Sequence, residues 1–274
     1  MPKNKTALRL TESAMMIAAA TILSFVKLVD LPAGGSITLA SMLPILLIAY
    51  RYGWAWGTLC GLVHGTIQFV IGSSVLSYVT GAASVCAVIL LDYVVAFAVI
   101  GLGGIMKKVT SSQTAALVSG AVVASVLRYV CHVISGSTVW AGLSIPTADA
   151  LGYSFIYNAT YMLPEMLILM VVAYYVSTAL DFASPRLAPA KKEASTPASR
   201  ALFATAGAVI CAGVVFDIAA VFSKLQNAET GEFDVTAITT VPWVWVICVS
   251  AAAAVIAAVL FAVKNSLARK NSGK

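Results

Sequence analysis

The sequence predicts an all-α integral membrane protein, and two observations carry that prediction. Of its 274 residues, 60% are hydrophobic and 10% are charged, and the mean hydropathy is +0.94. Soluble domains are about 45–50% apolar and about 25% charged. In addition, the apolar residues fall into long runs separated by short polar turns, as expected of helices that each need roughly 20 apolar residues to cross a bilayer. We therefore expect a multi-pass protein of the cell membrane.

Eight apolar runs are the predicted spans. They cover residues 8–29, 37–50, 54–73, 82–106, 114–136, 152–179, 201–222 and 241–263. The second run is short and contains Pro44, which predicts a kinked or tilted helix. The sequences PAGG (32–35) and YRYG (50–53) are turn signals on either side of it.

The distribution of lysine and arginine predicts the orientation. Basic residues precede the first span and follow the second, fourth, sixth and eighth: Lys3, Lys5, Arg9, Arg51, Lys107, Lys108, Arg186, Lys191, Lys192, Arg200, Lys264, Arg269, Lys270 and Lys274. With eight crossings these all lie on one side, which the positive-inside rule makes cytoplasmic. Both termini are then cytoplasmic. The net charge of +6 belongs to this membrane bias, so no nucleic-acid partner is expected.

The sequence divides into three parts. Residues 1–181 form a six-helix unit, residues 182–200 (FASPRLAPAKKEASTPASR) read as a cytoplasmic linker rich in Pro, Ala and Ser, and residues 201–274 form a two-helix extension. The N-terminus lacks a small-residue cleavage site after a short apolar core, so we interpret it as a retained first helix and not a signal peptide.

Enzymatic and metal chemistry are not expected. The five cysteines are odd in number and show no CxxC spacing, which supports neither a disulfide framework nor a zinc site. No HExxH, GxSxG or GxxxxGK[ST] motif is present. The sequence therefore predicts no catalytic residues, no metal and no cofactor, and any transport must draw on a gradient or on partner subunits.

Five ionisable residues fall at membrane depth: Asp92, Arg128, His132, Glu165 and Asp217. Each costs roughly 2.5–3.5 kcal/mol at the bilayer centre, so each calls for a partner or a function. Arg128 and His132 share a helix face with Ser135 in the stretch LRYVCHVISGSTVW (127–140). On the predicted topology they lie in the outer part of the membrane.

Polar and aromatic residues from three predicted spans reach similar depths in the outer half. They are Asp92 and Tyr93 from the fourth span, Arg128 and His132 from the fifth, Tyr153, Ser154 and Asn158 from the sixth, and Trp140 from the loop between the last two. This mixture predicts an outward-facing pocket for a small polar ligand with an aromatic or cationic part. A polar stripe of Ser154, Asn158, Tyr161 and Glu165 descends from it.

Structural explanations stay open for several of these residues. Asp92 and Arg128 can form an ion pair with each other and not with a ligand, and Trp140 and Tyr153 can be ordinary interfacial aromatics. Asp217 can face the outer headgroups. His64, in GLVHG, is expected to be a packing residue, and the sequence identifies no partner for Glu165.

The six-helix unit resembles the thiamine-specific S component of energy-coupling factor (ECF) transporters over roughly residues 7–180. The resemblance rests on RLTESAMMIAAA (9–20), PILLIAYRYGWAWGTLCGLVHG (44–65), LLDYVVA (90–96), LRYVCHVISGSTVW (127–140) and YSFIYN (153–158). The last three carry the specific pattern: an acid–Tyr pair, a basic residue–Tyr–x–x–His with a Trp eight residues after the His, and Tyr and Asn five apart.

The resemblance implies a ligand site and its roles. Asp92 takes the place of a glutamate that serves the cationic, amino-bearing ligand, and Arg128 that of a lysine at the ligand's polar edge. His132 and Trp140 stack on or flank the rings, whereas Tyr93, Tyr153 and Asn158 hydrogen-bond. The family also has a tryptophan in the loop between the first two helices, and LVDLPAGGSIT has none. Thiamine or a relative such as its pyrimidine precursor is the expected ligand.

The resemblance also implies partners, namely a transmembrane ECF subunit and two ATPase subunits that drive import in a prokaryotic cell membrane. Ala14 and Ala18 match the family's AxxxA docking pattern on the first helix, although an alanine-rich helix produces such a match readily. The last two helices have no counterpart in the family.

Two other functions compete. A self-sufficient proton-coupled transporter would use Glu165 and Asp217 as coupling acids, and an intramembrane enzyme would use Asp92 and His132.

Overall fold

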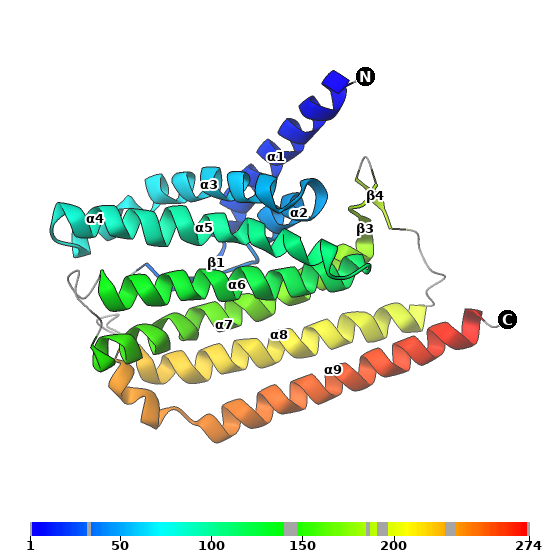
Figure 1. Cartoon of the computed structure of the whole chain (residues 1–274). Coiled ribbons are helices and arrows are strands. Elements are labelled where there is room, and N and C mark those ends of the chain that lie inside the picture. The colour runs from blue at the N-terminus through cyan, green and yellow to red at the C-terminus, as the bar shows by residue number, and fades with distance from the viewer. Residues whose placement is uncertain are drawn as a thin grey trace. The chain divides into compact units, whose positions relative to one another are not determined.

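The structure is a computed structural model that describes residues 2–31, 34–139, 147–184, 187–190, 197–227 and 234–272. The chain divides into two compact units, Met1–Ala188 and Pro189–Lys274. In Figure 1 the first unit runs from blue to yellow-green, and the second comprises the yellow to red helices.

Helices dominate the first unit. Its elements are α1 (Pro2–Phe25), β1 (Lys27–Asp30), β2 (Ser36–Thr38), α2 (Leu43–Tyr52), α3 (Trp54–Ile71), η1 (Ser73–Tyr78), α4 (Ala82–Val88), η2 (Ile89–Val95), α5 (Ala96–Ala98), η3 (Val99–Lys108), α6 (Gln113–Thr138), α7 (Ala148–Ala179) and β3 (Leu180–Asp181). The two-residue strand β4 (Ala188–Pro189) lies at the boundary between the units.

Six helices among the described residues are long and apolar enough to cross a membrane. They are Lys5–Phe25, Ala82–Val109, Gln113–Thr138, Ala148–Ala179, Pro197–Leu225 and Trp243–Lys264. This confirms the all-α membrane class. About eight spans were expected, the second of them short, and α3 (Trp54–Ile71, eighteen residues) is not among these six.

The predicted span at 37–50 is wrong. Residues Ser36–Thr38 form strand β2, which pairs antiparallel with β1, and the helix that follows has only ten residues. Ten helical residues cover about 15 Å, half of a hydrocarbon core. The polar and glycine residues before Leu43 favour the hairpin, and Gly53, at φ +94°, then turns the chain directly from α2 into α3.

The fourth span contains an irregular turn at a specific place. The helix from Ala82 to Lys108 is unbroken, but Ile89–Val95 forms a π-helix, and this turn carries Asp92 and Tyr93. A π turn adds one residue to a helical turn and so changes the direction in which its side chains point. The backbone of α3 packs directly on this turn at Gly65, where a Cβ would meet the carbonyl oxygen of Tyr93.

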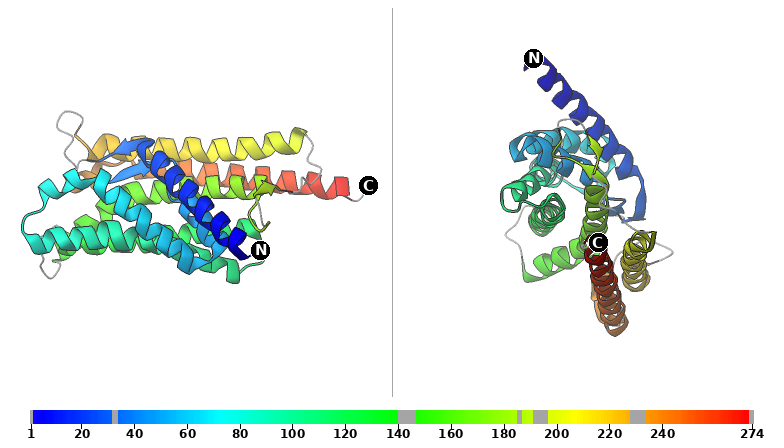
Figure 2. Two further views of the ribbon diagram at one scale, coloured as in Figure 1. Left: turned by 90° about the horizontal axis from the view of Figure 1, so that it is seen from above. Right: turned by 90° about the vertical axis from the view of Figure 1, so that its right-hand side faces the viewer.

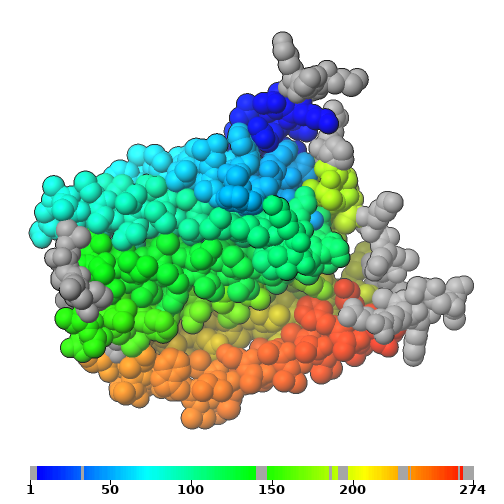
Figure 3. All heavy atoms as spheres, viewed as in Figure 1, coloured from blue at the N-terminus to red at the C-terminus, as the bar shows by residue number. Residues whose placement is uncertain are grey.

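The helix made of α4, η2, α5 and η3 lies beside α6, and α6 lies beside α7 (Figure 1). Figure 3 shows the same helices with all heavy atoms drawn. Fully buried apolar residues of α2 lie against η3 and α6, which makes the short α2 part of the core. The prediction of a six-helix bundle in this part is consistent with α1, α2, α3, α4–η3, α6 and α7.

A polar clasp holds one end of the first unit. Arg51 at the end of α2 donates to Glu12 on α1 at 2.8 Å and 3.1 Å, and the Tyr52 hydroxyl donates to the same carboxylate at 2.6 Å. Arg51 also donates to the carbonyl oxygens of Phe182 and Ser184. One guanidinium therefore ties α1, α2 and the segment after α7 together.

The second unit is a helical hairpin of α8 (Pro197–Leu225) and α9 (Trp243–Ser272), with the short η4 (Val235–Thr240) before α9. The two helices run antiparallel and side by side (Figure 2). Small residues allow the close approach, because Gly213 faces Ala253. Asp217 accepts a hydrogen bond from Ser250 at 2.5 Å, so its carboxylate joins the two helices.

Candidate functional site

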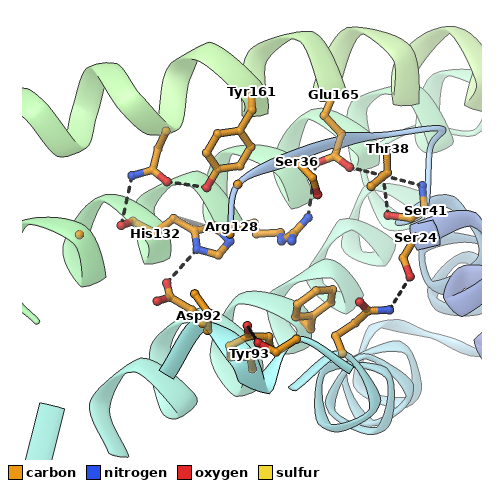
Figure 4. Close-up of a pocket in the computed structure, with 18 of the residues that line it drawn as sticks. Ser24, Ser36, Thr38, Ser41, Asp92, Tyr93, Arg128, His132, Tyr161 and Glu165 are labelled. Carbon is orange, nitrogen blue, oxygen red and sulfur yellow. Dashed lines mark hydrogen bonds and ion pairs between the residues drawn. The ribbon is translucent and has the colours of Figure 1, made fainter. Parts of the chain in front are cut away.

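One cavity of about 440 Å³ lies inside the first unit. The end of α1, the β1–β2 hairpin, α3, η2, α6 and α7 all contribute to its walls. Its volume is within the range of small-molecule sites, which is about 300–1,000 Å³. Polar groups from separate elements converge on it, as Figure 4 shows.

Six of the seven residues expected to bind ligand line this cavity: Asp92, Tyr93, Arg128, His132, Tyr153 and Asn158. The seventh, Trp140, lies outside the described residues. Ala14 and Ala18 do not line the cavity and are exposed on one face of α1. The polar stripe of α7 also reaches the cavity, through Ser154, Asn158, Tyr161 and Glu165.

The first charged group of the cavity is centred on Asp92. His132 Nδ1 lies 2.8 Å from Asp92 Oδ1, and the Ser135 hydroxyl donates to Asp92 Oδ2 at 2.7 Å. In the neutral tautomer that places the proton on Nδ1, facing the carboxylate, Nε2 is an acceptor. His132 Nε2 is buried and has no hydrogen-bond partner in the described part of the chain. It is therefore available to a donor on a bound molecule.

The second charged group is centred on Glu165, which is only 2% exposed. Its carboxylate accepts a hydrogen bond from the Thr38 hydroxyl and lies 3.5 Å from the Arg128 guanidinium. Arg128 also lies over the Phe97 ring, 4.5 Å from its centroid. The sequence offered no partner for Glu165, and the structure supplies one on β2 and another on α6. A buried ion pair of this kind replaces part of the hydration that both ions lose.

Arg128 lies between the two groups in Figure 4, with Asp92 and His132 on one side and Glu165 and Thr38 on the other. The structural alternative for Asp92 and Arg128 was an ion pair between these two residues. The contacts above join Asp92 to His132 and Arg128 to Glu165.

Tyrosines of α7 form an aromatic ladder along the cavity. Tyr153 and Tyr157 are stacked with centroids 6.0 Å apart, and Tyr157 meets Tyr161 edge-on at 5.8 Å. The ladder ends near His132, whose ring centroid is 6.5 Å from that of Tyr161. Because Tyr153 is 47% exposed and Tyr161 only 6%, the ladder runs from an accessible position to a buried one. Such faces suit a cationic aromatic ring.

Asn158 has a positioning role inside the site. Its Oδ1 accepts from the Tyr161 hydroxyl at 2.6 Å, and its amide donates to the carbonyl oxygen of Ser154 at 2.8 Å. A second amide contact reaches the carbonyl oxygen of His132 at 3.4 Å. Asn158 therefore fixes the ring of Tyr161 and links α7 to α6.

Sequence reasoning missed several residues that shape the cavity. Tyr157 could have been found, because it lies four residues after Tyr153 on the same helix face. Thr38 could not, because its place in an apolar run suggested a membrane span and not a strand. Gln68 and Ser24, joined at 2.8 Å, close the side between α3 and α1 and carry no recognisable motif.

His64 does not line the cavity, and its surroundings are those of a packing residue. It is 1% exposed, lies edge-on to Phe97 with centroids 5.2 Å apart, and has Nδ1 3.4 Å from the Thr21 hydroxyl. Among the described residues, no group of three or more His, Cys, Asp or Glu side chains could hold a metal ion.

Comparison with known proteins gives concordant results. Residues 10–183 match the family described as thiamine transporter protein. The thiamine transporter ThiT of Bacillus subtilis (strain 168) is 37% identical over 183 residues, which are 63% of this chain and 91% of that protein. The solved structure of ThiT from Listeria monocytogenes superposes with a TM-score of 0.50 at 22% identity, covering 63% of this chain and 94% of that one. That likeness concerns the fold.

Proposed function

This chain belongs to the thiamine transporter protein family, and from that membership we propose that its first unit captures thiamine outside the cell as the S component of an ECF importer. The family match ends at residue 183, close to the end of the first unit. The proposed function therefore belongs to residues 1–188. The second unit is an addition to it.

The observation that carries the proposal is the pairing of Asp92 with His132 beside the tyrosine ladder of α7. Thiamine has a permanently cationic thiazolium ring and an aminopyrimidine ring. A carboxylate and aromatic faces stabilise a ring that is both cationic and aromatic. The vacant Nε2 of His132 accepts a hydrogen bond from a donor such as the exocyclic amine.

The ligand-contacting residues in this proposal are Asp92, Tyr93, Arg128, His132 and Tyr153, together with Trp140, which lies outside the described residues. Asn158 contributes by holding Tyr161. Tyr93 is positioned by its hydroxyl, which donates to the carbonyl oxygen of Gly72 at 3.2 Å.

The cavity opens away from the cytoplasm in this proposal. It lies at the C-terminal end of α1, where Ser24 and Phe25 line it, whereas Arg51, Lys107 and Lys108 lie at the ends of α2 and η3. Lysine and arginine accumulate on the cytoplasmic side of membrane proteins. These positions support our proposal of an outward-facing site and cytoplasmic termini.

In this proposal the energy comes from partner subunits, since the sequence contains no phosphate-binding loop of its own. We assign the transmembrane ECF subunit to the exposed face of α1 that carries Ala14 and Ala18. Small residues four apart on an exposed face let a second helix approach closely. Two ATPase subunits would complete the complex.

The test is tryptophan fluorescence of the purified full-length protein titrated with thiamine, with the pyrimidine precursor in parallel. Saturable quenching by thiamine that is lost in Trp140→Phe is the expected result. A response to the precursor alone changes the substrate and keeps the site. Uptake driven by a proton gradient in proteoliposomes without any ATPase would instead support a secondary transporter.

A further inference from the structure

The cavity contains an acidic residue that lies apart from the Asp92 group. Glu165 comes from the middle of α7, next to Pro164, and contacts Thr38 on β2 and Arg128 on α6. Asp92 comes from η2 and contacts His132 and Ser135, both on α6. The two carboxylates therefore approach the same helix, α6, from different elements (Figure 4).

The formal charges of these groups add up to a net negative site. Two carboxylates, Asp92 and Glu165, face one guanidinium, that of Arg128, and His132 is neutral when Nδ1 alone is protonated. Among the described residues of the lining, the other cation is Lys27, which forms a salt bridge with Asp30 at 2.9 Å. Charges in a membrane-embedded cavity are poorly screened, so this sum acts on any ion that enters.

Glu165 is therefore the residue that makes the net charge of the cavity negative. Without its charge, Asp92 and Arg128 would balance each other, and a cation would gain little on entering. With its charge, the positive guanidinium is offset, and a monocation makes the occupied site neutral.

We propose that Glu165 is a specificity-determining positioning residue, which acts through Arg128 to make the cavity select a monocationic ring over its neutral counterpart. This inference rests on the proposed function and extends it, because it explains discrimination between thiamine and its neutral pyrimidine precursor. Glu165 need not touch the ligand. It holds the guanidinium against the Phe97 ring and supplies the second negative charge.

The experiment measures the affinities of two probes for the purified full-length protein at pH 8: thiamine, and neutral 4-amino-5-hydroxymethyl-2-methylpyrimidine. The quantity of interest is the ratio of the two dissociation constants. Glu165→Gln is expected to lower the preference for thiamine on the order of tenfold. Arg128→Gln is expected to raise that preference, because it removes the positive charge and leaves both carboxylates.

Two further variants separate charge from structure. Thr38→Val removes a hydrogen bond to Glu165 but no charge, so it should change both affinities by a similar factor and leave the ratio unchanged. The double variant Arg128→Gln with Glu165→Gln, which restores one net negative charge, should recover the wild-type ratio.

Equal weakening of both probes by Glu165→Gln, with an unchanged ratio in Arg128→Gln, would overturn the charge role and leave Glu165 as a structural residue. If Glu165→Gln does not fold, the ratios of dissociation constants for Arg128→Gln and the double variant still test whether the net charge of the cavity sets the preference. Wild-type protein that binds neither probe would overturn the proposed function itself, which is a different result from an unchanged ratio.

Discussion

His132 Nδ1 lies 2.8 Å from Asp92 Oδ1, although the two residues are forty positions apart in the chain. This contact joins α6 to the π-helical turn of the fourth span, and it leaves His132 Nε2 as an acceptor in the cavity. The contact between Asp92 and His132 orders the site, and the negative charge of Asp92 favours a bound cation.

Replacing Asp92 with asparagine should weaken thiamine binding on the order of 30-fold. The amide keeps the size of the side chain but loses the charge that attracts a cation and holds His132, and hydrogen bonds to charged groups contribute about 1.5–3 kcal/mol. Calorimetric titration of the purified variant measures the change. Ser135→Ala, which removes only the hydroxyl that donates to Asp92 Oδ2, is the matched control and should cost less. Wild-type affinity in Asp92→Asn would exclude the carboxylate from the site.

Tyr161 should act through its ring more than through its hydroxyl. Tyr161→Phe loses the hydrogen bond to Asn158 and should weaken binding a few-fold, whereas Tyr161→Leu also loses the aromatic face. A cation on an aromatic face gains about 0.5–2 kcal/mol, so the leucine variant should be weaker than the phenylalanine variant by up to about 30-fold. Fluorescence titration of both variants compares them. Equal losses in the two would show that the ring contributes nothing.

The polar clasp of Arg51, Glu12 and Tyr52 lies outside the cavity, so it should affect the stability of the protein and not its affinity for thiamine. Arg51→Met leaves the buried carboxylate of Glu12 without its cation, and loss of one member of a buried pair costs about 3–5 kcal/mol. We expect a clear drop in the detergent melting temperature, with unchanged thiamine affinity in the protein that remains folded. The double variant Glu12→Met with Arg51→Met should recover part of the loss. A melting temperature equal to wild type in Arg51→Met would mean that the clasp contributes little.

The second unit should be dispensable for ligand binding. Every described residue that lines the cavity belongs to the first unit, and the family match ends at residue 183, before the extension. A chain that ends at Ala188 is therefore expected to bind thiamine within about twofold of the full-length protein, a difference of under about 0.5 kcal/mol. Titration of the two proteins side by side tests this. A large loss of affinity in the shortened chain would assign the extension a role in the site.

Gly65→Ala should disturb the site from outside the cavity. Its new methyl group would meet the carbonyl oxygen of Tyr93, so α3 and the π-helical turn must separate. Both thermal stability and thiamine affinity are expected to fall. Gly152→Ala, where a Cβ meets nothing within 4 Å, is the control and should leave both unchanged.

The sequence predicted the class of protein and the charged side chains of η2, α6 and α7 that line the cavity, because these depend on local pattern. Arg128 and His132 lie four apart in one helix, so their shared face could be read directly. The sequence could not show which carboxylate contacts Arg128 and which contacts His132, because Asp92 and Glu165 come from other helices and tertiary packing decides the pairing. Sequence reasoning considered Asp92 as a partner for Arg128 and did not consider Glu165, whose carboxylate lies 3.5 Å from the Arg128 guanidinium.

The hairpin and the π-helix were beyond such reasoning for a different physical reason. Ser36–Thr38 lies in a run apolar enough for a membrane helix, and only its pairing with β1 makes it a strand. The turn Ile89–Val95 has the composition of an ordinary helix, so its sequence does not reveal the extra residue of the π-helix. The close packing of this turn on the backbone of α3 is visible only in the structure.

The π-helical turn gives the ligand site a dependence on chain length. Removing one residue between Ile89 and Val95 would let the turn tighten to an α-helix without changing the helices on either side, yet Asp92 and Tyr93 would point elsewhere. An insertion or deletion of a single codon can thus exchange the residues that face a ligand while the fold persists.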